Sequence, residues 1–505
     1  MSRASPRVLL WVAIAAYAAG LSALSILRHR AFSTGRFDLG NMVQAVWSTA
    51  HGHPLQITGL RGDQISRLGA HFDPILAAFA PLWLVWPSPD MLLVVQAAAV
   101  ALGALPVYWL ADKHLGSSRA ALGFALAYLL YPPTQWLTLN EFHPVALACP
   151  FLLFAFWYLD EDRLLPFAAF GLLAATTKEE VAFVVAGLGI WYAFSHRRRL
   201  QGAAIFVVGT ALALVAIEIV IPHFNRAGTS SFFTRYSEVG STPGGIVHTA
   251  ITDPWKIVTT AVTGRGLGYL ARLVLPLGLL VVLAPLVLIA ALPELGINLL
   301  SAATTQTSIR FHYTAGLVPI LVVAAVLGAA RLVRRRPGAA MPLATAAVAL
   351  GLASNYLLGP IPLWRYFPGG EQHQAYAAQV SEHDRIAARA LKLIPPRAVV
   401  SATNSLGAHL SARRRVLSFP YLQDAQWIAA DETAPGYADR LAPLPTAVQL
   451  SWLRRNPEWR LVFERDGILI FHRLSAPAST AKSATSNRSR TSRSQTGHSR
   501  RKMAQ

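Results

Sequence analysis

The feature that most constrains this chain is a succession of apolar segments that carry almost no charge. A helix that crosses the roughly 30 Å hydrocarbon core of a bilayer needs about 20 apolar residues, and slightly fewer can suffice. Only 14% of the 505 residues are charged, against roughly 25% in a soluble domain. The sequence therefore predicts a multi-pass membrane protein of about eleven helical spans. They cover 8–27, 90–111, 118–133, 144–159, 164–177, 181–194, 200–222, 267–282, 284–302, 313–332 and 339–358.

Basic clusters orient these spans. His196–Arg199 and Arg331–Arg336 each follow an apolar segment, and loops rich in Lys and Arg are normally cytoplasmic. A cytoplasmic N-terminus satisfies both clusters if 74–86, which is apolar but short, is a re-entrant or interfacial helix within a first external loop over 28–89. The sequence thus predicts a plasma-membrane protein. Because the formal charge of +20 lies largely in loops and a basic tail, it does not indicate a nucleic-acid partner.

Two of the apolar segments, 164–177 and 181–194, are short, and Lys178, Glu179 and Glu180 lie between them. At 1.5 Å per residue each helix covers only about 21 Å, which is less than the hydrocarbon thickness. We therefore expect a helical hairpin whose charged turn is sunk below the outer surface. Such a turn requires ion partners or a water-filled cavity.

The composition changes after residue 358, where short strand-like and helical patterns alternate. This alternation predicts a small α/β domain over 361–475, which the span count places outside the cell. The fold class is thus expected to be mainly α, with a membrane domain over 1–360. Residues 476–505 are rich in Ser, Thr and Arg without any acid, which predicts a disordered basic tail. The predicted domain contains a helix at 376–393, strands at 398–401, 415–418 and 427–430, a helix at 445–455, and a hairpin of 460–464 with 467–471.

Polar motifs interrupt or flank the apolar segments, and the predicted topology places all of them at the outer face. Ionisable groups close to hydrocarbon are costly and usually functional, so their convergence predicts a polar site. The motifs are Phe37-Asp38-Leu39-Gly40, His71-Phe72-Asp73-Pro74, Glu141-Phe142-His143-Pro144, Lys178-Glu179-Glu180 and Arg310-Phe311-His312-Tyr313.

Asp38 is open to two interpretations. It precedes 41–50, an amphipathic stretch that we expect on the membrane surface, so its side chain is a candidate helix cap. Alternatively it is a general base that takes a proton from an acceptor hydroxyl. Sequence alone does not separate the two.

Two acid–imidazole pairs follow in the chain, His71 with Asp73 and Glu141 with His143. Carboxylate and imidazole together can ligate a divalent metal, which is the one cofactor that the pattern admits. Asp and His directly before Pro are also common at helix starts, so capping and loop packing remain the alternative.

The cationic motifs suit a phosphate. Lys178 is either part of a self-neutralising triad with Glu179 and Glu180, or binds a lipid phosphate while one glutamate shapes an acceptor site. Arg310 and His312 suit the same phosphate, since a guanidinium can donate two hydrogen bonds to it. The alternatives are a cation reaching towards headgroups and, for the neighbouring Tyr313, an interfacial anchor.

Taken in order, these motifs, together with Gln44-Ala45-Val46-Trp47, Ala80-Pro81-Leu82 and Pro293-Glu294-Leu295, resemble an uncharacterised family of bacterial multi-pass membrane proteins. That family, a domain of unknown function, is grouped with the GT-C glycosyltransferases, and the resemblance covers roughly residues 30–475. It implies transfer of a sugar from a polyprenyl-phosphate donor to an envelope acceptor at the outer face. In that case Asp38 is the general base.

The same resemblance implies supporting roles for other residues. Asp73 or Glu141 assists the base or binds metal, while Lys178 and Arg310 hold the donor phosphate as its charge builds. Two rival functions remain open. One is a transporter or lipid flippase with a polar intramembrane site, although the sequence lacks the inverted repeats that such proteins often show. The other is a non-catalytic scaffold for envelope assembly.

Overall fold

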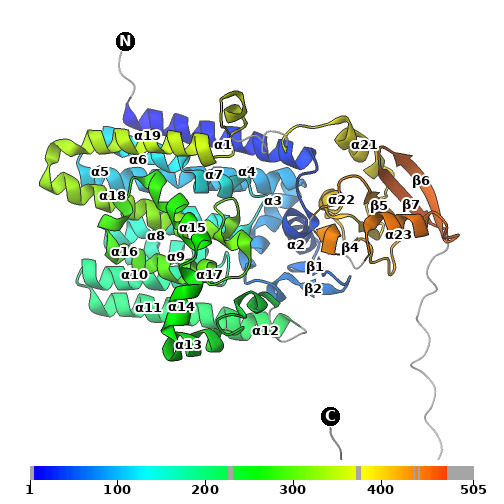
Figure 1. Cartoon of the computed structure of the whole chain (residues 1–505), viewed down its shortest axis with the longest axis horizontal. Helices are drawn as coiled ribbons and strands as arrows, with labels where there is room; N and C mark the ends of the chain where they lie inside the picture. Colours follow the sequence, from blue (N-terminus) through cyan, green and yellow to red (C-terminus); the bar gives the residue numbers. More distant parts are fainter. Residues whose placement is uncertain (1–4, 226–230, 371–376, 437, 442–443, 475–505) are drawn as a thin grey trace, which may run out of the picture.

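The computed structural model describes residues 5–225, 231–370, 377–436, 438–441 and 444–474. An elongated helical body carries a small α/β domain at one end, which we call the domain end (Figure 1). The expected class, mainly α with a small C-terminal α/β domain, is confirmed. The tail expected over 476–505 lies outside the described residues.

Long helices such as α1, α18 and α19 run along the long axis of the body (Figure 1). The body contains α1 Pro6–Arg30, α4 Pro89–Leu102, α5 Ala104–Leu115, α6 Ser118–Leu130, α7 Pro132–Leu139, α8 Ala148–Asp160, α9 Leu164–Ala175, α10 Val181–Ser195, α11 Arg199–Leu214, α12 Ile221–Phe224, α13 Pro243–Thr252, α14 Pro254–Ala261, α15 Gly264–Val274, α16 Pro285–Leu288, α17 Leu292–Leu299, α18 Leu317–Arg335 and α19 Ala340–Leu358.

Among the described residues, five helices are long and apolar enough to cross a membrane. Shorter apolar helices coincide with five further predicted spans, 118–133, 144–159, 164–177, 181–194 and 284–302. The five long ones are Pro6–Arg30, Pro89–Leu115, Arg199–Phe224, His312–Arg335 and Pro337–Leu358.

The prediction of a span over 267–282 was wrong. Helix α15 ends at Val274 and is followed by a 3-10 turn over Leu275–Leu277. Gly278 and Leu279 then both adopt positive φ angles, of 66° and 60°. A left-handed pair of this kind cannot continue a right-handed helix, so the apolar composition of the segment does not produce a spanning helix.

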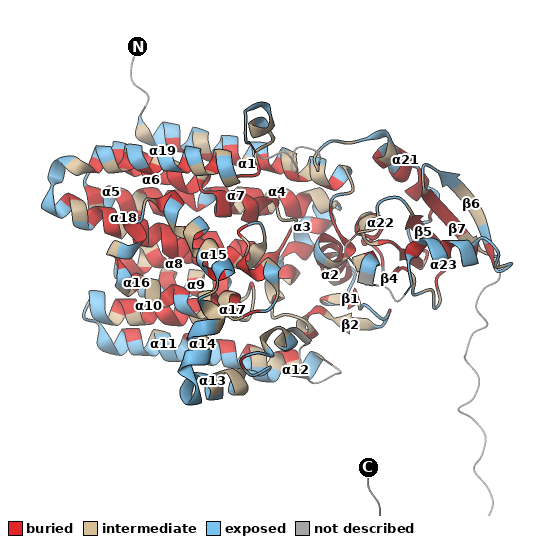
Figure 2. Ribbon diagram, viewed as in Figure 1, coloured by how far each residue is buried: buried red, intermediate tan, exposed pale blue. Residues whose placement is uncertain are grey.

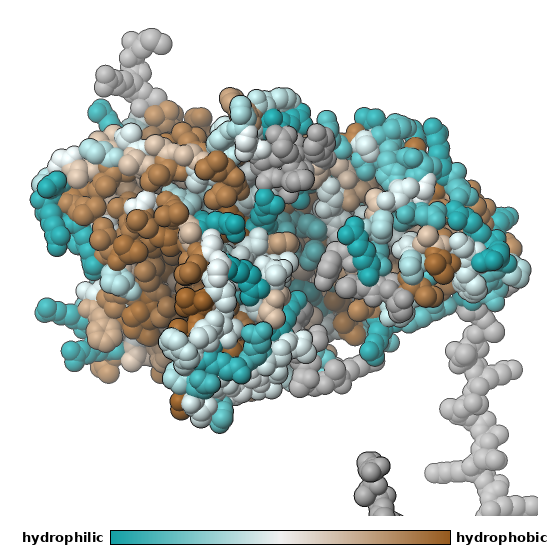
Figure 3. Space-filling model, in the orientation of Figure 1, coloured by the Kyte–Doolittle hydropathy of each residue, from teal (hydrophilic) through white to brown (hydrophobic). Residues whose placement is uncertain are grey.

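The surface of the body is itself apolar. Figure 3 shows hydrophobic residues over the helical part and hydrophilic residues over the α/β domain. Leu165 and Leu200 are 82% and 85% exposed, and much of α11, which carries the exposed Val207 and Val208, is coloured as exposed (Figure 2). Contiguous apolar surface of this extent is normally covered by a partner or a membrane. The chain is accordingly a multi-pass membrane protein.

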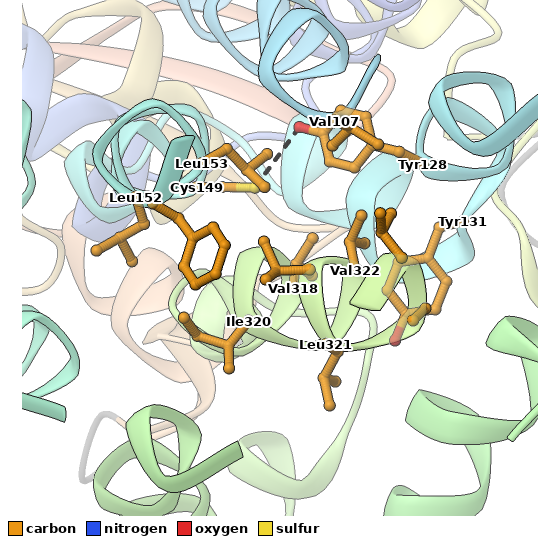
Figure 4. Close-up of a cluster of buried hydrophobic side chains, with 14 of the residues drawn as sticks. Val107, Tyr128, Tyr131, Cys149, Leu152, Leu153, Val318, Ile320, Leu321 and Val322 are labelled. Atoms are coloured by element: carbon orange, nitrogen blue, oxygen red, sulfur yellow. Dashed lines mark hydrogen bonds between the residues drawn. The ribbon is translucent and has the colours of Figure 1, made fainter. Parts of the chain in front are cut away.

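The interior of the body is closely packed. Tyr128 donates its hydroxyl to the Val100 carbonyl and contacts the Cys149 thiol, in a cluster completed by aliphatic side chains of α18 (Figure 4). Helices α10 and α11 approach so closely that a Cβ atom on Gly202 would lie 2.6 Å from the Gly189 carbonyl oxygen. Small residues allow this close approach. The hydrophobic effect does not drive helices together in lipid, so close packing contributes to their association.

The α/β domain is built on a five-stranded mixed sheet of order β4-β3-β5-β7-β6. Strand β3 is parallel to β4 and β5, whereas β7 is antiparallel to β5 and β6. Helix α21 begins at a capping box formed by Ser381 and Asp384, as expected for an amphipathic helix start. The elements are α21 Glu382–Leu391, β3 Val400–Ala402, α22 Asn404–His409, β4 Val416–Ser418, β5 Trp427–Asp431, α23 Thr446–Leu453, β6 Trp459–Arg465 and β7 Ile468–Arg473.

The loop after α1 contains a single π-helical turn, η1 Arg36–Gly40, followed by α2 Asn41–Ala50. A short hairpin of β1 Gln56–Thr58 and β2 Gln64–Ser66 was not expected. The predicted re-entrant segment forms a 3-10 turn, η3 Pro74–Phe79, and a short helix, α3 Ala80–Val85. The expectation that 41–50 lies on the membrane surface was wrong, because most of α2 is buried, between the body and the hairpin.

Candidate functional site

Asp38 lies in η1 at the domain end, where its carboxylate oxygen Oδ1 is 3.3 Å from His143 Nε2. The Asp38 side chain is 52% exposed, whereas that of His143 is only 7% exposed. Burial alone would raise the pKa of Asp38, but the hydrogen bond and charge of His143, with the charge of Arg67, lower it. Asp38 is thus an accessible carboxylate that favours its ionised form.

The capping interpretation of Asp38 was wrong. The residue before α2 is Gly40, and no side chain caps that helix. The same holds for Asp73 before η3 and for His143 before the turn η4 Pro144–Leu147, neither of which makes a side-chain cap. These side chains instead form contacts within the site.

His143 is held by both of its ring nitrogens. Nδ1 lies 2.7 Å from the Asn140 carbonyl oxygen while Nε2 faces Asp38. Both partners are acceptors, so both nitrogens donate only when the ring is an imidazolium or shares a proton with Asp38. The His312 ring stacks on His143 at 3.8 Å, and Asn140 Oδ1 accepts from the His312 backbone N–H.

Glu141 holds the backbone around Asp38. Its carboxylate accepts from the Gly35 N–H at 3.0 Å and the Leu39 N–H at 2.9 Å, on either side of Asp38. Burial and the charge of Asp38 raise the pKa of Glu141 to about 8, against the opposing effect of these amides. Gln96 in turn donates to the Glu141 carbonyl and accepts from the His143 N–H. Glu141 therefore supports the loop and does not face the solvent as a second free carboxylate.

Asp73 is paired with an arginine. Asp73 is 2% exposed and both Nε and Nη2 of Arg67 lie 2.8 Å from its Oδ2. Burial raises the pKa of Asp73 although Arg67 opposes this. Since Arg67 also lowers the pKa of Asp38, the two acids share this cation.

The charged turn of the α9–α10 hairpin divides between two partners. Lys178 Nζ lies 2.5 Å from Glu180 and sits over the Tyr313 ring at 5.5 Å. Glu179 accepts from His71 Nδ1 and from the Phe72 N–H, both at 2.9 Å. The triad interpretation thus holds only for Lys178 with Glu180, because Glu179 anchors the segment that leads into η3.

Arg310 lies in a cleft of about 460 Å³ beside this cluster. Its guanidinium sits 5.5 Å from the Trp136 ring centre. Asn140 links the cleft to His143 and His312 through the contacts described above. The cleft is lined by Arg28, Trp136, Leu139, Asn140, Thr304, Thr305, Ser308, Arg310 and Phe311.

A second cavity, an apolar groove of about 580 Å³, lies between α1 and α6. Its wall includes Leu27 and Gln135, the chain neighbours of the cleft residues Arg28 and Trp136. The cleft and the groove therefore take consecutive residues of α1 and of α7 into their walls.

The four expected metal ligands do not converge. Within the described residues, no group of three or more His, Cys, Asp or Glu side chains is arranged to hold a metal ion. His71 turns to Glu179, Asp73 to Arg67, and Glu141 to backbone amides. The four residues are therefore not arranged as a metal centre. Metal dependence of the protein stays a prediction.

Sequence reasoning missed several residues of the site. Arg36 and Arg67 are buried, at 1% and 7% exposed. Their sequence signal was position, because Arg36 lies two residues before Asp38 and Arg67 lies six residues before Asp73. Asn140 and Gln96 gave no signal. Glu294, within the Pro-Glu-Leu motif, is buried and accepts from the Gly316 N–H at 3.0 Å.

The chain belongs to a family described as Predicted membrane protein (DUF2079), whose model matches residues 28–470. A search of curated proteins found no match. The family assignment agrees with the resemblance seen in the motifs. It adds no activity of its own.

Two solved structures of ArnT from Cupriavidus metallidurans are similar to this chain. The one bound to undecaprenyl phosphate is 14% identical with a TM-score of 0.49, covering 91% of this chain and 97% of that chain. The apo state is 13% identical with a TM-score of 0.43, covering 86% and 93%. Scores of this size establish neither a shared fold nor a shared activity.

Proposed function

We propose that this DUF2079 membrane protein is a glycosyltransferase of the GT-C type, which moves a sugar from a polyprenyl-phosphate donor to an envelope acceptor at the outer face. The observation that carries the proposal is the arrangement of three features. An apolar groove and a cleft lined by two arginines have consecutive residues of α1 and α7 in their walls, and Asn140 connects that cleft to the Asp38–His143 pair.

The donor fits this junction by its chemistry. Its prenyl chain would occupy the groove along α1 and α6, and its phosphate would lie in the cleft between Arg28 and Arg310. Guanidinium groups match phosphate oxygens with paired hydrogen bonds. We assign the phosphate to Arg28 and Arg310, which line the cleft, and give Lys178, which pairs with Glu180, a supporting electrostatic role.

In the transfer step, the acceptor oxygen forms a bond to the anomeric carbon while the bond between that carbon and the phosphate oxygen breaks. The electron pair leaves with the polyprenyl phosphate, whose growing charge the arginines stabilise. Asp38 takes the proton of the acceptor hydroxyl. His143 orients the carboxylate, and the low pKa of Asp38 keeps it ionised before the step.

The test is reconstitution of the purified protein in vesicles with radiolabelled polyprenyl-phosphate sugars and an envelope extract as acceptor. We expect the label to move to a new product while free polyprenyl phosphate accumulates. A donor that is never consumed, together with a solute or lipid that crosses the bilayer, would establish the transporter alternative. Native mass spectrometry of the purified protein should detect bound polyprenyl phosphate.

A further inference from the structure

The turn that carries Asp38 is held from two sides by different parts of the chain. From the body, Glu141 accepts from the amides of Gly35 and Leu39. From the α/β domain, Asn404 Oδ1 accepts from the Phe37 N–H at 3.4 Å. Within the turn Asp38 is the exposed residue. The backbone of the turn is therefore fixed while its carboxylate remains accessible.

Arg36 is the main connection to the α/β domain. It is 1% exposed. Its Nη2 and Nε donate to the Val416 carbonyl at 2.8 and 3.1 Å, and Nη1 donates to Ser418 Oγ at 2.7 Å. Nη2 also donates to the Thr58 carbonyl at 2.7 Å. One guanidinium thus joins η1, the edge strand β4 and the β1–β2 hairpin.

The edge of β4 is closed by neighbouring residues as well. Thr58 Oγ1 accepts from the Val416 N–H at 3.3 Å, and Gln44 Nε2 donates to the Arg413 carbonyl at 3.1 Å. An edge strand normally presents unpaired amides and carbonyls. Here the first loop supplies partners for them, so the α/β domain is docked by hydrogen bonds that lie beside the site.

Close packing leaves the turn little freedom. A Cβ atom on Gly40 would lie 2.6 Å from Ser411 Oγ. A Cβ atom on Gly407 would lie 3.1 Å from the Arg36 side chain. Movement of the α/β domain would therefore displace η1 directly.

We propose that the docked α/β domain positions Asp38 through Arg36, so that Arg36 is a positioning residue and undocking of the domain switches the site off. The catalytic part of this inference rests on the proposed function, whereas the mechanical part does not. A displacement of about 1 Å at a reacting group can cost roughly 10²-fold in rate. A tether two residues from Asp38 is therefore a sensitive point of control.

The first experiment measures amide hydrogen exchange of the peptide that contains residues 35–40 in the full-length protein. Arg36→Met keeps most of the apolar stem but removes the guanidinium donors. Hydrogen bonds from a charged group are stronger than those between neutral groups, so their loss should accelerate exchange in this peptide at least about tenfold. Arg36→Lys should also accelerate it, because an ammonium does not reproduce the planar fork.

The matched control is Arg454→Met. Arg454 pairs with Glu432 and with Glu464 of β6, the strand at the opposite edge of the sheet from β4. It should leave exchange in 35–40 within about twofold of the wild type. Equal acceleration by both variants, or none by Arg36→Met, overturns the proposal. If Arg36→Met fails to fold, Ser418→Ala removes one acceptor and should give a smaller acceleration in the same peptide.

A covalent rescue separates positioning from general stability. Gly40 has φ −61° and ψ −41°, values that cysteine adopts freely, and its Cβ would face Ser411. Gly40→Cys with Ser411→Cys in the Arg36→Met background should restore protection when oxidised and lose it on reduction. A disulfide that forms without restoring protection would contradict the tethering role.

The second experiment uses the transfer reaction. Arg36→Met should lower kcat by about 10²-fold with the donor KM within about twofold, because Arg36 touches neither substrate. The apparent pKa of the acid limb of its pH–rate profile should move towards that of an ordinary carboxylate, because the hydrogen bond from His143 to Asp38 and the effect of the Arg67 charge both weaken. A large rise in KM with unchanged kcat overturns the assignment. If the wild type transfers nothing but the exchange results hold, the proposed function fails while the tether stands.

Discussion

The two ends of the helical body both carry many charges, but the charges are organised differently. At the end opposite the α/β domain, Lys113 pairs with Asp160 at 2.7 Å and Glu161 at 2.6 Å. Arg198 pairs with Asp162 at 2.8 Å, and both side chains are about half exposed. These ion pairs connect the loops after α5, α8 and α10 to one another, beside the basic clusters His196–Arg199 and Arg331–Arg336.

At the domain end each acid of the site has its own partner, and among Asp38, Asp73, Glu141 and Glu179 only Asp38 is exposed. Asp73 has Arg67, Glu179 has His71, and Glu141 has backbone amides. Asp38 keeps half of its surface exposed. Exposed ion pairs contribute little to folding stability. Those at the opposite end are best explained as contacts that hold neighbouring loops together. A buried shell around a single accessible carboxylate is the organisation expected of a reaction site.

The largest expected effect is a loss of transfer when Asp38 at the domain end is replaced. Asp38→Asn keeps the size of the side chain but removes its basicity, and general-base assistance is worth roughly 10²–10⁴-fold in rate. We expect transfer to fall by at least about 10²-fold while the protein stays folded in the membrane. The measurement is single-turnover transfer from a polyprenyl-phosphate sugar. Near-normal transfer would return the search for the base to Asp73 or Glu141.

A smaller effect is expected in the cleft. Arg310→Met removes a charged donor from the proposed phosphate position, where such hydrogen bonds contribute about 1.5–3 kcal/mol. The KM for the lipid donor should rise at least about tenfold with a modest change in kcat. Arg335→Met, a basic residue near the end of α18, is the control and should leave KM unchanged. An unaltered KM in Arg310→Met would shift the phosphate towards Lys178.

The same comparison shows what sequence reasoning can predict. Apolar length and basic clusters predicted the helical class, and short apolar runs located strands such as β4 and β5, because these follow from local composition. The polar motifs also indicated which residues gather at one end of the body. Which residues pair with one another was not predictable, because the Asp38–His143 contact spans 105 positions and the Arg36–Val416 contact spans 380. The break at Gly278 was missed because an apolar run does not report backbone conformation.

A third effect concerns stability at the opposite end. Asp160 is 5% exposed at its side chain and accepts from both Lys113 and His114. Asp160→Asn weakens both contacts, and we expect a loss of about 1–3 kcal/mol in folding stability. Transfer per folded molecule should remain within about twofold of the wild type. A selective loss of transfer in folded Asp160→Asn would break the distinction between the two ends.

The smallest expected effect is on how steeply the folding stability changes with pH. The pKa of Glu141 is raised from 4.5 to about 8 in the folded protein by burial and by Asp38. Between these values the folded state binds more protons than the unfolded chain, so the Glu141 contribution to stability declines as pH rises. Above about 8 the contribution no longer changes.

Glu141→Gln still accepts from the Gly35 and Leu39 amides but cannot titrate. Its melting temperature in detergent should therefore fall less between about pH 6 and about pH 9 than that of the wild type. Glu161→Gln removes a carboxylate at the opposite end and should keep the wild-type slope. Parallel curves for the wild type and Glu141→Gln would mean that the backbone amides keep Glu141 ionised throughout. Glu141 would then hold the Asp38 turn as a permanent anion, with like-charge repulsion from Asp38 absorbed by His143 and Arg67.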